Sequence, residues 1–156
     1  MQVRPAYPND AVLICEVLKR SIAELCWADH DNRDDILLPW LANKKPENVR
    51  TWIETPFQLM LVAEVGSAMA GVGLVTDGGD ILLNYVAPEY RFHSVSKALM
   101  LALEEYLVLR GVTVARLVST ETARRFYAER GYKPAGNSQI WRGQQLSYPM
   151  EKQLKV

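Results

Sequence analysis

The stretch ILLNYVAPEYRFHSVSKALM, from Ile81 to Met100, is the most informative part of this chain. Its pattern predicts a buried strand, a turn containing Pro88, a short polar loop and the first turns of an amphipathic helix. Backbone N–H groups at a helix start lack intrahelical partners, and the helix dipole adds positive potential there. Arg91 and Lys97 add positive charge beside these groups. The stretch therefore predicts a site for a phosphate-bearing ligand.

Length and composition indicate one compact domain. The 156 residues can bury a sizeable core but are short for two domains. The 18 basic and 18 acidic side chains cancel, which argues against nucleic acid as a main partner. The apolar runs are too short to cross a bilayer and the N-terminus lacks a signal-peptide core, so we expect a cytoplasmic protein without a membrane partner. Cys15 and Cys26 lie too far apart on one predicted helix for a disulfide and are expected to be buried thiols.

The N-terminal part is expected to be mainly helical after a short strand at Val3–Ala6. An apolar stripe over residues 11–26 recurs at i, i+3 and i+4 and predicts the first helix, and Asp29 continues the same face. Two more helices are expected at Leu37–Asn43 and Glu47–Glu54.

From Phe57 the hydrophobic period changes to that of strands. The segments FQLMLVAEV and AMAGVGLVT predict a hairpin joined at Gly66-Ser67. The elements expected after the strand that begins at Ile81 are a helix ending near Gly111, a strand at Val112–Val118, a short helix from Ser119 or Thr120 to Arg130, and two closing strands with a turn near Arg142-Gly143. This order predicts a single domain over residues 1–156, with a mixed α/β sheet and helices on both of its faces.

Two motifs in register resemble those of one family. The loop Arg91-Phe92-His93-Ser94-Val95-Ser96 resembles the acyl-CoA signature [QR]-x-x-G-x-[GA] of the GNAT superfamily of N-acyltransferases. Downstream, Thr120-x-x-Ala123-x-x-Phe126-Tyr127-x-x-x-Gly131-Tyr132 is similar to that family's N-x-x-A-x-x-F-Y-x-x-x-G-F segment. With the order of elements, the resemblance covers nearly the whole chain from Val3. It implies an α/β (α+β) fold: one GNAT-like domain with a mixed, mostly antiparallel sheet of about seven strands.

The loop departs from the family pattern at both glycine positions, which are Ser94 and Ser96 here. Glycine allows close approach of the backbone to phosphate and a positive φ. The change at Ser94 matters more, because a positive φ would cost a serine on the order of 1 kcal/mol.

The resemblance implies an acetyl-CoA-dependent N-acetyltransferase. Such an enzyme transfers the acetyl group to a primary amine of a small molecule or peptide by direct attack in a ternary complex. Acetyl-CoA is then the cosubstrate, no metal is required, and a homodimer is compatible with the family. An alternative is a catalytically degenerate module of the same fold that binds CoA or a metabolite as a sensor. The two serines, and the lack of Asp or Glu in Ile81–Val86, favour this alternative modestly.

The resemblance also assigns roles to residues. Tyr127 matches the residue that protonates the departing thiolate, and a backbone N–H within Asn84–Val86 is expected to stabilise the oxyanion. Tyr127 could instead be an ordinary core aromatic, and Thr120 could simply cap its helix. The residues expected to bind acetyl-CoA are Asn84, Tyr85, Val86, Arg91, Phe92, His93, Ser94, Val95, Ser96, Lys97, Thr120 and Ala123.

The general base and the acceptor are less well determined. Asp29 and His30 are the candidate substrate-contacting residues, and a relay through ordered water is an equal alternative. Four aspartates within residues 29–35 would favour a cationic amine by electrostatic attraction. The other interpretation of this segment is a solvated acidic loop.

Overall fold

A computed structural model describes residues 1–141 and 145–155. The elements in chain order are β1 (Gln2–Pro5), η1 (Pro8–Asp10), α1 (Ala11–Leu25), α2 (Trp27–His30), α3 (Asp34–Leu41), α4 (Pro46–Glu54), β2 (Gln58–Val65), β3 (Ala68–Thr76), β4 (Asp80–Val86), η2 (Pro88–Tyr90), α5 (Val95–Leu109), β5 (Val114–Ser119), α6 (Arg124–Glu129), β6 (Lys133–Pro134), β7 (Gln139–Trp141) and β8 (Gln145–Gln153). Within these residues no helix combines the length and the hydropathy needed to cross a membrane.

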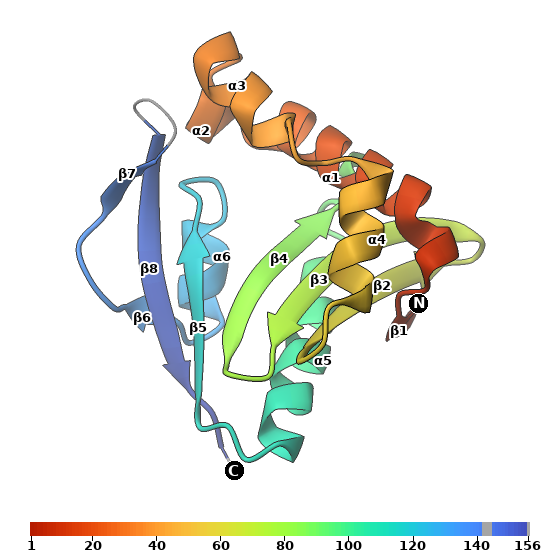
Figure 1. Cartoon of the computed structure of the whole chain (residues 1–156). Coiled ribbons are helices and arrows are strands. Elements are labelled where there is room, and N and C mark those ends of the chain that lie inside the picture. Colours follow the sequence, from red (N-terminus) through yellow and green to blue (C-terminus); the bar gives the residue numbers. More distant parts are fainter. Residues whose placement is uncertain (142–144, 156) are drawn as a thin grey trace.

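The strands form one mixed sheet in the order β1-β2-β3-β4-β5-β8-β6, with β7 paired to β8 (Figure 1). All the pairings are antiparallel except that between β4 and β5. The predicted mixed, mostly antiparallel sheet is therefore confirmed. It has eight strands rather than about seven, because the segment before β8 forms two short strands instead of one.

Helices cover both faces of the sheet, as the alternation along β2 requires. Met60 and Val62 pack in a core cluster with the buried residues of α1, whereas Leu61 and Ala63 pack with those of α5. Helix α6 joins the α5 side through Tyr127. In Figure 1, α1 and α4 lie on one side of the sheet and α5 on the other.

Helix α5 packs unusually close to β3 because two glycines face it. A β-carbon at Gly71 would lie 2.8 Å from Cγ1 of Val95 and 2.9 Å from Cδ1 of Leu99. One at Gly73 would lie 3.0 Å from Leu103. Glycine at both positions thus lets the first turns of α5 seat directly on the sheet.

The sheet is divided between β4 and β5. These parallel strands pair only at Asp80 with Arg116 and at Ile81 with Leu117, and then diverge. On its other edge β4 has a bulge at Leu82, because Ile81 pairs with Val75 while Leu83 pairs with Leu74. The backbone of β4 beyond Ile81 consequently has no strand beside it on the β5 side.

Asp29 connects the two halves of the molecule at the open end of this gap. Its carboxylate accepts hydrogen bonds from the backbone N–H of Glu121 at 2.7 Å, the N–H of Thr122 at 3.1 Å and the Thr122 hydroxyl at 2.5 Å. Asp29 belongs to α2, and its partners lie in the turn between β5 and α6. The halves are therefore held at both ends of the gap.

Three local predictions need correction. Helix α3 begins at Asp34 rather than near Leu37, and α2 is an additional helix. Helix α6 begins at Arg124 rather than directly after Thr120, because Asp29 and the Thr120 hydroxyl hold residues 120–123 as a turn. The turn expected near Arg142-Gly143 lies outside the described residues. Cys15 and Cys26 are buried free thiols, as predicted.

We predict that Asp29→Ala lowers the free energy of unfolding by about 1–3 kcal/mol, because it leaves two partly buried backbone N–H groups without their acceptor. Urea denaturation measures this change. The matched control is Glu24→Gln, which removes only an exposed i,i+4 ion pair with Arg20 and should cost less than about 0.5 kcal/mol. Equal effects of the two substitutions would show that the Asp29 contacts contribute nothing specific.

Candidate active site

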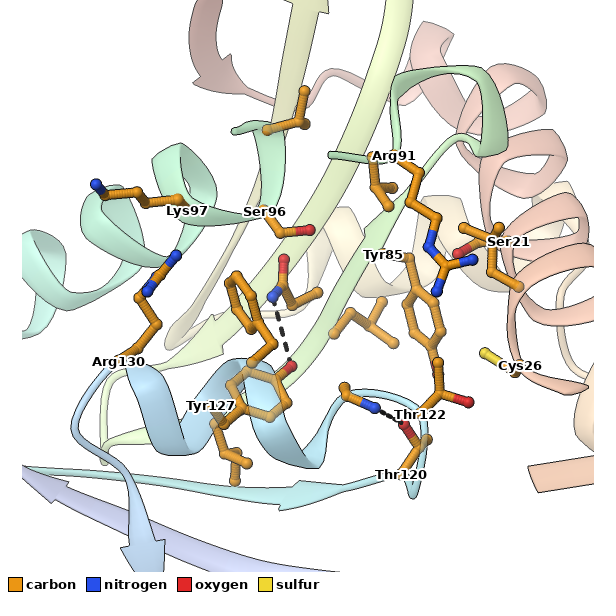
Figure 2. Close-up of a pocket in the computed structure, with 18 of the residues that line it drawn as sticks. Ser21, Cys26, Tyr85, Arg91, Ser96, Lys97, Thr120, Thr122, Tyr127 and Arg130 are labelled. Atoms are coloured by element: carbon orange, nitrogen blue, oxygen red, sulfur yellow. Dashed lines mark hydrogen bonds between the residues drawn. The ribbon is translucent and has the colours of Figure 1, made fainter. Parts of the chain in front are cut away.

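A cavity of about 530 Å³ occupies the gap between β4 and β5 (Figure 2). Its walls come from Ile81–Val86 of β4, from Leu117 and Val118 of β5, and from α1, α6 and the loop before α5. Because α1 lies on one face of the sheet and α5 and α6 lie on the other, the cavity extends through the sheet. This size is within the usual range for small-molecule sites.

The loop before α5 presents unpaired backbone N–H groups to this cavity. In the described part of the chain, the N–H groups of Ser94, Val95, Ser96 and Lys97 have no hydrogen-bond acceptor. All four residues line the cavity. Since these groups lie at the N-terminal end of a 15-residue helix, the dipole of α5 adds to their positive potential. The arrangement can bind an anion such as a phosphate.

Ser94 adopts the left-handed conformation that its place in the signature demands. Its φ is 63° and its ψ is 15°, and Phe92 has a φ of 66°. A non-glycine residue in this region is strained by roughly 1 kcal/mol or more. The loop thus has the backbone shape of a glycine-containing loop although both glycine positions hold serine.

Tyr127 lies across the cavity from this loop. Asn84 Nδ2 donates a hydrogen bond to the Tyr127 hydroxyl oxygen at 3.4 Å, so the hydroxyl hydrogen remains free to be donated elsewhere. Burial raises the pKa of Tyr127 to about 12, and the Asn84 contact opposes only part of that rise. Tyr127 is therefore a protonated donor at neutral pH. It also packs against Phe126 and Tyr132, so it serves the core as well.

Thr120 caps the turn that leads into α6. Its Oγ1 accepts a hydrogen bond from the backbone N–H of Ala123 at 3.1 Å, and both residues line the cavity. Thr120 therefore does not cap helix α6, whose N-cap residue is Ala123, but holds the turn before it, and its hydroxyl hydrogen stays available to a ligand.

His30 does not contact the cavity, contrary to the role considered for it from the sequence. Its side chain is fully buried. Nε2 lies 2.9 Å from the carbonyl oxygen of Ile22, and Nδ1 accepts from the N–H of Asn32 at 2.8 Å. Asp29 is also outside the cavity lining, since its carboxylate binds the turn after β5. The hydrophobic stripe placed Asp29 on the inward face correctly but made no prediction for His30, and both side chains bind protein groups.

Several cavity residues were not singled out from the sequence. They are Ser21, Leu25, Cys26, Tyr90, Thr122, Arg125, Phe126, Glu129 and Arg130. The sequence signal for Ser21 would have been its position as a polar residue within the mostly apolar helix α1. Burial raises the pKa of Cys26 to about 12, with the nearby Asp29 carboxylate adding to the effect. The thiol is accordingly protonated at neutral pH and is no nucleophile there.

Two buried polar atoms in the cavity wall are without partners. Among the described residues, neither Asn84 Oδ1 nor Arg130 Nε has a hydrogen-bond partner. Buried polar groups are normally satisfied, so these atoms indicate a place where a polar ligand belongs. They lie on β4 and just after α6, the two elements that flank the gap.

Comparisons with known proteins agree with this geometry. A GCN5-related N-acetyltransferase from Rhodopseudomonas palustris has 25% sequence identity and a TM-score of 0.84, over 98% of this chain and 95% of that one. The PaiA N-acetyltransferase from Thermoplasma acidophilum, solved with coenzyme A, has 21% identity and a TM-score of 0.80, over 97% and 98% of the two chains. YncA from Salmonella typhimurium, described as a putative acetyltransferase with its cofactor acetyl-CoA, has 17% identity and a TM-score of 0.75, over 100% and 95%.

A search of curated proteins finds no match. The family model described as an acetyltransferase (GNAT) domain matches residues 38–154, which include β4, the loop before α5, and Tyr127. With the divided sheet and the cavity between β4 and β5, this match shows that the chain belongs to the GNAT acetyltransferase family.

Proposed function

We propose that this protein is an acetyl-CoA-dependent N-acetyltransferase that acts on a primary amine. The observation that carries the proposal is that one cavity is lined both by four unpaired backbone N–H groups at the start of α5 and by the protonated Tyr127. Two of the similar structures were solved with coenzyme A or acetyl-CoA, which supports the same cosubstrate here.

The cavity offers each part of acetyl-CoA a suitable partner. The pyrophosphate would accept hydrogen bonds from the N–H groups of residues 94–97, with Lys97 adding charge. The pantetheine arm would lie in the gap, beside the edge of β4 that β5 leaves free, and near Thr120 and Ala123. The thioester carbonyl would then reach a backbone N–H within Asn84–Val86, which acts as the oxyanion donor.

The reaction balances with the groups available. The amine nitrogen attacks the thioester carbon, an N–C bond forms, and the tetrahedral oxyanion is held by the β4 backbone. Collapse breaks the C–S bond, and Tyr127 donates its hydroxyl proton to the departing thiolate. The proton lost by the amine returns to the tyrosinate through solvent. Direct attack is favoured over an acetyl-cysteine intermediate, because Cys26 is protonated at neutral pH.

Water is the best candidate for removing the proton from the incoming ammonium. The one carboxylate among the described cavity-lining residues is Glu129, which belongs to α6 and pairs with Arg125. The positive charge of Arg91 at the α1 end disfavours the ammonium form of the acceptor. A neutral amine would therefore form by proton loss to water rather than to a protein base.

The sensor alternative is not favoured. The sequence argument for a sensor rested partly on the serine at position 94, but Ser94 has the positive φ that a glycine would adopt in this loop. A protonated tyrosine aimed at the cavity also has no evident use in a protein that only binds its ligand.

We predict that acetyl-CoA stabilises the protein against heat. At a concentration 100 times its Kd the stabilisation is about 2.7 kcal/mol, which for a domain of this size raises Tm by roughly 5–10 °C. Differential scanning fluorimetry measures the shift. Pantetheine, which lacks the phosphates, is the control and should give little shift at the same concentration. Absence of a shift at millimolar acetyl-CoA would reject both the N-acetyltransferase proposal and the CoA-sensor alternative.

We predict that Tyr127→Phe lowers kcat by about 100-fold or more, the usual contribution of a positioned general acid. KM for acetyl-CoA should change little, because the ring and its packing remain. The pKa of about 12 implies that the wild-type rate shows no loss from Tyr127 ionisation below about pH 10. Thiol release measured against pH tests both statements. Unchanged kcat in the variant would remove Tyr127 from the mechanism.

We predict opposite effects on stability for the two loop serines. Ser94→Gly should raise the free energy of unfolding by about 0.5–1 kcal/mol, because it relieves the strain at a φ of 63°. Ser96→Gly should lower it by a similar amount, because residue 96 is helical. Urea denaturation of both variants gives the comparison. The same sign for both would mean that Ser94 is not strained.

A further inference from the structure

The end of the cavity toward α1, where the amine acceptor would bind, is called the acceptor end. Its lining lacks the negative charge that the aspartates of residues 29–35 suggested from the sequence. The walls at this end come from α1, from Tyr85 of β4, from Tyr90 and Arg91 of the following loop, and from Thr122 after β5. The α1 contribution is Ser21, Leu25 and Cys26. Hydroxyl groups and apolar surface predominate, and Arg91 supplies the only formal charge among these described residues.

Of the acidic segment after α1, Asp29 lies near this end, where its charge acts on Cys26, but it is not part of the cavity lining. Asp29 uses its carboxylate on Glu121 and Thr122, outside the lining. Asp34 and Asp35 are exposed on the first turn of α3, and Asp35 pairs with Arg33. The segment thus places no carboxylate in the cavity lining, and the Asp29 oxygens are already bonded to Glu121 and Thr122 rather than free to hold a polycationic acceptor.

Arg91 is the cation that this end leaves unused. In the described chain its side chain forms neither a hydrogen bond nor an ion pair, and its guanidinium stacks over the Phe92 ring, 4.7 Å from the ring centroid. Figure 2 shows the Arg91 side chain pointing toward Ser21 and Cys26, whereas Lys97 and Arg130 lie at the opposite end of the cavity. The charge of Arg91 also reaches Cys26, where it opposes the rise in the thiol pKa.

The cations therefore divide between two places. Lys97, Arg125 and Arg130 lie on the α5 and α6 side, where the phosphate groups of the cosubstrate are proposed to bind. Arg91 lies on the α1 side, although it is the first residue of the loop signature. A planar guanidinium with five N–H donors matches a carboxylate in a bidentate geometry.

We propose that the amine acceptor carries its own carboxylate, and that the Arg91 guanidinium binds this carboxylate while the amine faces the thioester. The substrate class is thus an amino acid or a similar small amino-carboxylate, rather than a polyamine or another polycation. This inference rests on the proposed N-acetyl transfer. Arg91 then determines acceptor specificity, and the cosubstrate is held by the backbone of residues 94–97 and by Lys97.

The test compares each amino acid with its carboxamide, which keeps the amine and the side chain but lacks the negative charge. Thiol release from acetyl-CoA gives kcat/KM for both members of each pair. In the wild type we expect the acid to exceed its amide by at least tenfold. Arg91→Gln should bring this ratio to within about twofold of 1, and Arg91→Lys should restore part of it. The change in ratio between proteins cancels intrinsic differences in amine reactivity.

Lys97→Gln is the matched control, since it removes a cation at the other end of the cavity. It should raise KM for acetyl-CoA and leave the ratio of acid to amide unchanged, whereas Arg91→Gln should leave KM for acetyl-CoA within about twofold. If Arg91→Gln instead raises KM for acetyl-CoA as Lys97→Gln does, Arg91 serves the cosubstrate and the inference is overturned.

Wild-type preference for amides or polyamines over acids would also overturn the inference, while leaving N-acetyl transfer intact. Release of no thiol with any amine, despite binding of acetyl-CoA, would reject the proposed function itself. The two failures are therefore distinguishable.

Discussion

The functional arrangement depends on the brief pairing of β4 with β5. Two residue pairs hold the strands together at Asp80 and Ile81, and beyond them each strand follows its own half of the sheet. A strand edge without a neighbour leaves backbone donors and acceptors unsatisfied, which a folded protein normally avoids by covering the edge. Here the free edge lines a cavity, so a ligand that forms hydrogen bonds can occupy the place of the missing strand.

A gap through a sheet also needs contacts that hold the two halves together. The Asp29 carboxylate provides one at the open end, between α2 and the turn that carries Thr122. On the α5 side, Glu104 accepts hydrogen bonds from Tyr132 at 2.7 Å and from Lys152 at 3.0 Å. These contacts join α5, which packs on the N-terminal half, to β8 and to the segment between α6 and β6. The walls of the cavity are thus fixed before any ligand binds, which reduces the ordering that binding requires.

The parts of the site that are local in sequence could be predicted, and those that join distant residues could not. The loop before α5 and the position of Tyr127 follow from short motifs, because a helix start and a cap depend on neighbouring residues. Asp29 shows the limit. Its place on the inward face followed from helical periodicity, but its partner at Glu121 lies 92 residues away, and no spacing rule could supply it. The direction in which the Arg91 side chain points could not be predicted for the same reason, since it is defined relative to α1, which is distant in the sequence.

The close contact of α5 with β3 has a consequence for tolerance to mutation. Gly71 does not line the cavity, yet any side chain there would push on Val95 and Leu99, the residues that seat the first turns of α5. The shift would carry the N–H groups at the helix start with it. A saturation scan scored for acetyltransferase activity would therefore mark Gly71 as strongly as a ligand-contacting residue, although it lies in the interior of the sheet. The position of the anion-binding N–H groups at the start of α5 therefore depends on the absence of a β-carbon at Gly71 in the core.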